Sequence, residues 1–166
     1  YRDLSHLPLA ERAGTNFDEP ASLDDGLLLE HCAALAAGGA IAVPGYDFTT
    51  HSRTASIERL EPADSVIVEG LFTLYWASLR RLLHAGVYVE LEDETCFARR
   101  LARDVRERGR TPECIERQYR DTVRPMAELY IWPTRRHADV VVRGDAVLEE
   151  SVAAVIGYLN GQALSA

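Results

Sequence analysis

Three short apolar runs, separated by helical patterns, constrain the fold of this chain more than any other feature. They lie at 65–69, 87–91 and 140–142 and are rich in valine and isoleucine. Consecutive apolar residues indicate strands that are buried on both faces, as in a parallel sheet. The alternation of strands and helices is typical of α/β proteins. The sequence therefore predicts an α/β fold, with a parallel sheet covered by helices on both faces, in a single domain spanning 1–166.

The remaining elements follow from periodicity and from turn residues. A helical turn is expected at 9–13, and helices are expected at about 22–37, 75–83, 93–108, 111–131 and 148–159. Pro125 is expected to interrupt or bend the helix at 111–131. Two extended segments, at about 40–48 and 54–60, predict a β-hairpin with a bend or bulge at Pro44-Gly45. This hairpin lobe, at about 40–60, is expected to be an insertion in the sheet domain.

The stretch Arg99–Arg110 contains six arginines in twelve residues. As a helix it has an apolar side and an arginine side (Phe97, Leu101 and Val105; Arg99, Arg103 and Arg106), with Asp104 between them. Gly109 is expected to end this helix, and Thr111-Pro112 to begin the next. Guanidinium groups bind phosphate oxygens through paired, charge-assisted hydrogen bonds. The stretch is thus a candidate polyphosphate site, and the alternative is an exposed helix face with i,i+4 ion pairs.

Composition excludes several other classes of function. The net charge of −8 argues against a broad nucleic-acid-binding surface, and no apolar run approaches the roughly 18 residues of a membrane span. Cys32, Cys96 and Cys114 are odd in number and widely spaced, which is typical of reduced thiols in a cytoplasmic protein. All 18 basic residues are arginine, so these residues contain no phosphate loop with the G-x-x-x-x-G-K-[ST] pattern.

Two further groups of residues are candidates for ligand contacts. Glu69 ends the apolar run at 65–69, and the carboxyl ends of parallel strands are where ligands bind in open α/β sheets. An acid there can hold Mg²⁺, although acids at strand ends are common in loops. Tyr46, Phe48 and His51 flank the hairpin tip, where they can stack on a heterocycle or can pack across the strands.

Ten segments, in order from Tyr1 to about Val142, resemble the uridine kinase (uridine–cytidine kinase) family. They are Tyr1-Arg2-Asp3, Asn16-Phe17-Asp18-Glu19-Pro20, Leu27-Leu28-Leu29-Glu30-His31, Pro44-Gly45-Tyr46-Asp47-Phe48, His51-Ser52-Arg53, Val68-Glu69-Gly70, Arg99-Arg100 through Arg108-Gly109-Arg110, Gln118-Tyr119, Val123-Arg124-Pro125 and Ala138-Asp139-Val140. The resemblance implies a P-loop-kinase-like, doubly wound parallel sheet with an inserted β-hairpin lobe and an Arg-rich helical lid at about 99–125. It also implies transfer of the γ-phosphate of ATP or GTP to the 5′-hydroxyl of uridine or cytidine, with Mg²⁺, in a cytoplasmic homotetramer.

The resemblance also implies roles for particular residues. Asp18 falls on the position that holds the ribose hydroxyls, and Glu69 falls on the Mg²⁺-linked acid. The catalytic and nucleotide-binding residues of the lid correspond to Arg103, Arg108 and Arg110. The nucleoside-binding residues correspond to Tyr1, Asp18, Tyr46, Phe48, His51, Arg100 and Gln118.

The chain departs from the family pattern in several places. The family's phosphate loop, with its lysine, and its aspartate base correspond to positions before Tyr1, so a polypeptide of only these 166 residues is expected to lack kinase activity. The family usually has a bulkier residue at Gly45, and Arg143-Gly144-Asp145 is shorter than the corresponding family segment. Two alternatives therefore stay open: a non-catalytic nucleoside- or nucleotide-binding relative, and a P-loop kinase of another acceptor, such as a phosphoribulokinase-like enzyme.

Overall fold

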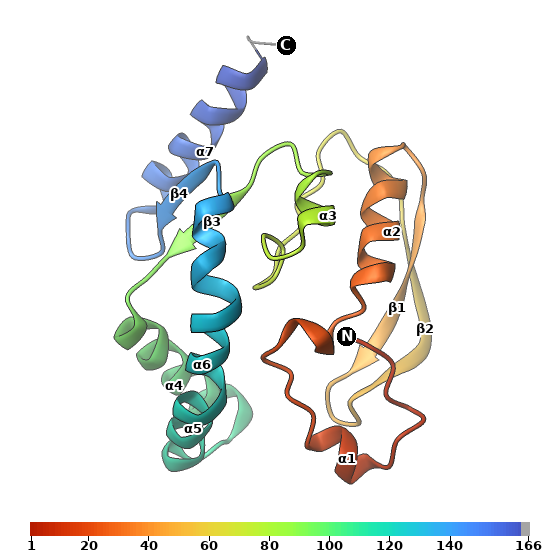
Figure 1. Ribbon diagram of the computed structural model, residues 1–166, viewed down its shortest axis with the longest axis vertical. Coiled ribbons are helices and arrows are strands. Elements are labelled where there is room, and N and C mark those ends of the chain that lie inside the picture. The colour runs from red at the N-terminus through yellow and green to blue at the C-terminus, as the bar shows by residue number, and fades with distance from the viewer. Residues whose placement is uncertain (164–166) are drawn as a thin grey trace. The chain divides into compact units, whose positions relative to one another are not determined.

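The chain divides into two compact units in the computed structural model, which describes residues 1–163 (Figure 1). Unit 1 is Tyr1–Leu82 and unit 2 is Leu83–Ala166. Whether the two units form one domain stays a prediction. No helix in the described part of the chain combines the length and the apolar character that crossing a membrane requires.

Unit 1 contains three short helical elements, one longer helix and the hairpin. Its elements are α1 (Leu9–Ala13), the 3₁₀ helix η1 (Pro20–Ser22), α2 (Asp25–Ala36), β1 (Ile41–Asp47), β2 (Ser52–Leu60) and α3 (Ala77–Arg80). Helix α2 begins where the Asp24 carboxylate accepts a hydrogen bond from the Leu27 amide at 3.1 Å. It ends before Gly38, whose φ of +79° is the left-handed conformation that commonly terminates helices. The predicted turn at 9–13 and the predicted hairpin are confirmed, whereas α3 is a single turn instead of the helix expected at 75–83.

The two strands of the hairpin are antiparallel and contain a bulge. Ile41 pairs with Leu60 at one end, and Asp47 pairs with Ser52 at the other. Pro44 pairs with Ile57 and Tyr46 pairs with Arg53, so residue 45 of β1 faces residues 54–56 of β2. The extra residues therefore lie on β2, where the Ser56 amide donates a hydrogen bond to Thr54 Oγ1 at 3.3 Å. The bend predicted near residues 44–45 is confirmed, and the bulge adjusts the direction of the strands toward the hairpin tip.

Gly45 fits this bulge because it has no side chain. A Cβ atom at this position would lie 2.5 Å from Thr54 Oγ1 and would also collide with the Ser56 hydroxyl. We expect Gly45→Ala to lower the free energy of unfolding by about 1–2 kcal/mol. The clash of the added methyl group destabilises the folded state by more than the lower conformational entropy destabilises the unfolded chain. Urea unfolding monitored by circular dichroism measures this difference. The Thr54→Ala/Ser56→Ala background is the control, and an equal loss of stability in that background would contradict the steric explanation.

The segment 65–69 is not a strand, and the prediction that it lies in the parallel sheet is wrong. Ile67 is 92% exposed and Val66 is 47% exposed. A strand is stabilised by hydrogen bonds to a neighbouring strand, and within residues 1–163 no strand pairs with this segment. Its β-branched residues favour an extended backbone but do not supply that partner. Glu69 therefore lies at the end of an irregular, exposed segment rather than at the end of a buried strand.

Unit 2 contains the predicted parallel strand pair. Strand β3 (Val87–Glu90) pairs in parallel with β4 (Val140–Arg143), so that Val87 lies opposite Val140. The prediction that these two strands are parallel neighbours is confirmed. The prediction that they are buried is wrong, since Val89 is 63% exposed and Val141 is 38% exposed. Helix α7 (Leu148–Ala163) packs against β4, but burial on both faces requires a covering layer on each side of a wider sheet.

The helices of unit 2 begin and end largely where the sequence predicts. Helix α4 (Asp93–Arg108) has acidic residues in its first turn and arginines in its last, which complements the helix dipole. The next helical run consists of α5 (Pro112–Gln118), the π-helical η2 (Tyr119–Val123), α6 (Arg124–Met126), the π-helical η3 (Ala127–Ile131) and the 3₁₀ helix η4 (Trp132–His137). The α-helical geometry gives way to π-helical geometry on both sides of α6, which contains Pro125. Because proline has no amide hydrogen, it interrupts the regular hydrogen-bond pattern, as predicted.

Candidate functional site

Five aromatic rings form a cluster in unit 1. Tyr1 and Tyr46 have ring centroids 5.1 Å apart, and Tyr46 and Phe48 have centroids 5.2 Å apart. Phe17 lies 5.4 Å from Tyr1 and stacks on His51 at 4.8 Å with an interplanar angle of 18°. We call these five residues the aromatic cluster. It brings together four residues that the sequence predicts to contact the nucleoside, and it adds Phe17, which the prediction missed although it directly precedes Asp18.

The hairpin tip that carries His51 has a constrained backbone. His51 has a φ of +50°, in the left-handed region that residues other than glycine rarely adopt. The Asp47 carboxylate accepts hydrogen bonds from the Thr49 amide at 2.7 Å and from the Thr50 hydroxyl at 2.9 Å, and these bonds lower the pKa of Asp47. The Arg12 guanidinium donates to the Thr50 carbonyl at 3.1 Å. These contacts hold the residues that lead into His51.

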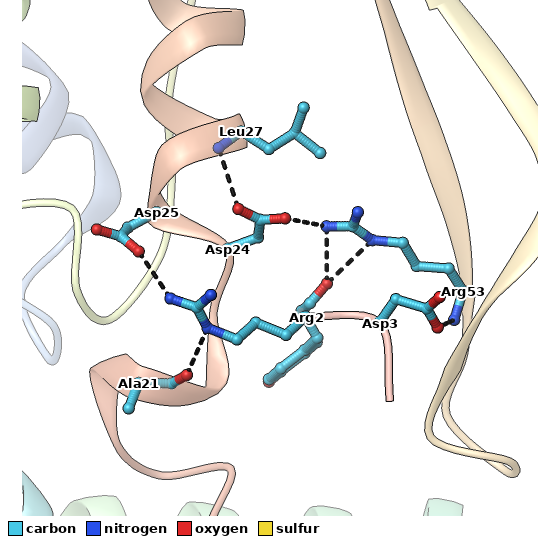
Figure 2. Close-up of polar contacts among 8 residues, drawn as sticks. Arg2, Asp3, Ala21, Asp24, Asp25, Leu27 and Arg53 are labelled. Atoms are coloured by element: carbon cyan, nitrogen blue, oxygen red, sulfur yellow. Dashed lines mark hydrogen bonds and ion pairs between the residues drawn. The ribbon is translucent and has the colours of Figure 1, made fainter. Parts of the chain in front are cut away.

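The start of the chain is joined to α2 and β2 by Arg53 (Figure 2). The Arg53 guanidinium donates hydrogen bonds to the Tyr1 carbonyl at 3.2 and 3.3 Å and to Asp24 Oδ2 at 2.8 Å. Arg2 donates to Asp25 Oδ1 at 3.0 Å and to the Ala21 carbonyl at 2.9 Å. The hydrogen bond from the Leu27 amide, followed by the contact with Arg53, lowers the pKa of Asp24. The Tyr1 carbonyl is therefore tied to β2 through Arg53, and the neighbouring residue Arg2 is tied to η1 and to the first residue of α2.

A cavity of about 200 Å³ lies next to the aromatic cluster in unit 1. Its lining includes Tyr1, Tyr46 and Arg53, together with apolar residues of α2 and β1. The Tyr46 hydroxyl is buried and makes no hydrogen bond within the described residues. Burial, followed by the charges of nearby groups, raises the pKa of Tyr46, so its hydroxyl is protonated at neutral pH. This hydroxyl can donate a hydrogen bond to a ligand beside the cluster.

Asp18 lies in the turn that also supplies Phe17. The Asp18 amide donates a hydrogen bond to Asn16 Oδ1 at 3.0 Å, an interaction that is typical of asparagine in turns. The Asp18 side chain is half-buried, and its sequence neighbour stacks on His51. Asp18 is therefore adjacent in sequence to a member of the aromatic cluster. Its contact with the ribose hydroxyls stays a prediction.

Glu69 is an isolated, exposed acid. It makes no hydrogen bond or ion pair within residues 1–163, and that part of the chain has no group of three or more metal-ligating side chains. Magnesium is usually bound by one or two carboxylates together with phosphate oxygens and water. A single accessible carboxylate is compatible with that kind of site, and the metal-linked role of Glu69 stays a prediction.

Four arginines surround the carboxylate of Asp104 in unit 2. Arg103 lies 2.8 Å from Oδ1 and Arg108 lies 3.4 Å from it, whereas Arg110 lies 3.2 Å from Oδ2 and Arg100 lies 3.8 Å from it. We call these five residues the arginine cluster. The Asp104 side chain is fully buried, although the sequence interpretation placed it between the two faces of the helix. Its spacing of seven residues from Phe97, about 20° around an α-helix, was the signal for burial on the apolar face.

Helix α4 is held against the following helical run by polar and aromatic contacts. Arg100 donates a hydrogen bond to Gln118 Oε1 at 3.1 Å, so these two predicted nucleoside-site residues are brought together. Phe97 packs on Tyr119 with centroids 5.0 Å apart, and the Tyr119 hydroxyl donates to Asp93 Oδ1 at 2.6 Å. Burial, followed by the bond to Asp93, raises the pKa of Tyr119. Apart from Asp18 and Glu69, the predicted site residues therefore form two groups, and each group is assembled within its own unit.

A profile of the Phosphoribulokinase / Uridine kinase family matches residues 5–149. The chain belongs to this family. Its curated relatives in the phosphoribulokinase / uridine kinase family include the uridine kinase of Chloroflexus aggregans, which is 47% identical over 87% of this chain and 69% of the relative. The uridine kinases of Vibrio atlanticus and Vibrio cholerae are each 44% identical over 86% of this chain and 67% of their own length. The resemblance found in the sequence is therefore confirmed.

Membership of the phosphoribulokinase / uridine kinase family establishes the general class of fold and reaction. The α/β architecture is that of a P-loop kinase, an enzyme class that transfers a phosphoryl group from a nucleoside triphosphate. The matched region contains the hairpin and α4 with its arginines, so every member of the two clusters except Tyr1 lies inside the matched region.

Proposed function

We propose that this protein is a uridine–cytidine kinase. It transfers the γ-phosphoryl group of ATP or GTP to the 5′-hydroxyl of uridine or cytidine, giving UMP or CMP. The support comes from relatives named uridine kinase at 44–47% identity. The two groups of candidate residues are of the chemical types that bind a nucleoside and a polyphosphate.

The aromatic cluster is the observation that favours a nucleoside over a sugar phosphate as acceptor. Aromatic rings bury and stack on a planar base, whereas a sugar phosphate has no flat apolar surface. His51, with one donating and one accepting nitrogen in its neutral form, can pair with the O4 of uridine or the N4 of cytidine. Asp18 is proposed to accept hydrogen bonds from the ribose hydroxyls, and Arg100 and Gln118 are proposed to contact the nucleoside.

The arginines are proposed to act on the transferring phosphoryl group. In phosphoryl transfer, negative charge spreads over the three oxygens of that group while the bond to the donor breaks and the bond to the 5′-oxygen forms. Arg103, Arg108 and Arg110 supply fixed hydrogen-bond donors for this charge. Bound Mg²⁺ would neutralise charge on the β- and γ-phosphates, and Glu69 would hold it directly or through water.

Several finer features belong to the same proposal. Residues of about 40–60 act as an inserted lobe on a doubly wound sheet, and residues of about 99–125 act as the lid over the triphosphate. The protein is proposed to be a cytoplasmic homotetramer, which agrees with its three free cysteines. Light scattering of the purified protein measures the oligomeric state.

Initial-rate kinetics of the intact protein on four acceptors test the proposed function. We expect kcat/KM for uridine and cytidine to exceed that for adenosine and for ribulose 5-phosphate by at least about 100-fold. This ratio corresponds to a difference of about 3 kcal/mol in the free energy of transition-state binding, which a site that hydrogen-bonds its substrate can supply. A preference for ribulose 5-phosphate would assign the protein to another acceptor. Uridine binding without phosphorylation would identify a non-catalytic relative.

A further inference from the structure

Asp104 is the common partner of every arginine in the arginine cluster. Its side chain has no exposed surface, while the side chains of Arg103 and Arg108 are 46% and 55% exposed. Arg110 and Arg100 are less exposed, at 27% and 18%. The carboxylate therefore lies beneath the guanidinium groups, and the outer side of the arginines faces solvent.

The backbone of Asp104 also fixes the turn that follows the helix. Its carbonyl accepts hydrogen bonds from the Gly109 amide and, at 3.2 Å, from the Arg110 amide. Gly109 has a φ of +60°, a left-handed conformation that reverses the chain at the helix end. The reversal returns Arg110 toward the last turns of α4, where its guanidinium reaches Asp104 Oδ2. One residue thus positions arginines that lie before and after the end of the helix.

The charges of the arginine cluster do not balance. Four guanidinium groups surround one carboxylate, so these five side chains carry a net charge of +3 (four positive minus one negative). Burial opposes ionisation of Asp104, but the hydrogen bond from Arg103 and the charges of Arg108 and Arg100 together lower its pKa. The carboxylate therefore stays ionised at neutral pH. Each arginine retains N–H groups that Asp104 does not use, and the excess positive charge is suited to a polyphosphate.

We propose that Asp104 is a positioning residue that holds Arg103, Arg108 and Arg110 together as a preformed phosphate-binding group before the nucleotide arrives. This inference rests on the proposed function. It adds to the proposed machinery a residue that does not itself contact the substrates. Without the buried carboxylate, the guanidinium groups repel one another and separate. The nucleotide then has to gather them during binding, and it loses the benefit of preorganisation.

A purely structural ion pair is the alternative explanation, and α4 itself provides the comparison. Arg106 and Glu107 also form an ion pair on this helix, but both side chains are exposed, at 77% and 51%, and within residues 1–163 Glu107 makes no other ion pair. Removing the charge of Glu107 thus changes one exposed pair, while removing that of Asp104 changes the arrangement of four arginines.

The test compares Asp104→Asn with Glu107→Gln in the intact protein. Asparagine keeps the size of the side chain but replaces a charged acceptor with a donor that faces guanidinium groups. We expect Asp104→Asn to weaken binding of the Mg²⁺ complex of ATP at least 10-fold and to lower kcat at least 10-fold, with uridine affinity changed less than 3-fold. Glu107→Gln is expected to leave all three quantities within 2-fold. Isothermal titration measures binding below the melting temperature of each variant, and steady-state kinetics give kcat.

Two outcomes would overturn the inference. The first is an Asp104→Asn variant that is less stable but binds ATP as the wild type does, since that result makes Asp104 structural only. The second outcome concerns the wild type and can be measured even if the variant fails to fold. A preformed arginine cluster requires that the amides of Gly109 and Arg110 are protected from hydrogen exchange in the absence of nucleotide. Unprotected amides would mean that the arginine cluster is not preformed.

ATP binding does not depend on the acceptor, so a wild type that phosphorylates no pyrimidine nucleoside contradicts the proposed function and leaves this test of Asp104 intact.

Discussion

In the intact protein, replacing Arg110 or Arg108 with alanine is expected to lower kcat for uridine phosphorylation by about 100-fold, because removal of one donor from a transition-state charge site commonly has an effect of this size. The Arg110 and Arg108 guanidinium groups lie 3.2 and 3.4 Å from the same carboxylate, so both are held in the arginine cluster. The affinity for uridine is expected to change little, because the charge that these groups stabilise develops on the phosphoryl group. Steady-state kinetics and equilibrium titration with uridine measure the two effects separately.

Arg106→Ala is the matched control for these variants. Arg106 lies on the same helix, is 77% exposed and, in the described part of the chain, pairs only with Glu107, so its loss is expected to leave kcat unchanged. If Arg108→Ala and Arg110→Ala also retain the wild-type kcat, the arginines belong to an exposed helix surface and have no catalytic role.

Replacing His51 is expected to lower kcat/KM for both uridine and cytidine by roughly 5- to 150-fold. This range corresponds to about 1–3 kcal/mol, the usual cost of leaving one polar edge of a bound group without its partner. Adenosine is expected to be a poor substrate for the wild type and the variant alike, since a purine is larger than a pyrimidine and is expected to clash with Tyr46. Kinetics on the three nucleosides measure the effect.

The unusual backbone of His51 allows its two roles to be separated. Because residue 51 has a φ of +50°, glycine fits the backbone better than alanine does. We therefore expect His51→Gly to be at least as stable to heat as His51→Ala, with an equal loss of kcat/KM. His6→Ala, which removes an exposed histidine of the same unit, is the control for both measurements. Wild-type activity of both His51 variants on both pyrimidines would make His51 a structural residue of the hairpin.

The predictions that the structure confirms depend mainly on local interactions. Helix α4 begins at Asp93 and ends at Arg108, because acidic residues suit its start and Gly109 permits the left-handed turn at its end. Helix α5 begins where Thr111 Oγ1 accepts a hydrogen bond from the Cys114 amide at 3.3 Å and Pro112 occupies the first helical position. These features are determined by residues within a few positions of one another, so the sequence alone specifies them.

The failed predictions concern features that depend on distant partners. Residues 65–69 have the composition of a strand, but a strand exists only where a neighbour satisfies its hydrogen bonds, and the described residues provide none beside it. The burial predicted for β3 and β4 similarly depends on layers that composition does not specify. The stack of Phe17 on His51 joins residues 34 positions apart in sequence (51 minus 17) and could not be read from either segment.

The sequence by itself determined the family, the helix boundaries, the hairpin and the residue types available for binding a nucleoside and a polyphosphate. Only the tertiary structure decided which of those residues meet. It buried Asp104 beneath four arginines, one of which follows the end of the helix, and it gathered the aromatic rings of the start of the chain with those of the hairpin. The physical reason is that capping, glycine conformations and turn chemistry act over a few residues. Burial and the contacts among aromatic rings depend instead on packing against other segments of the chain, which local patterns do not specify.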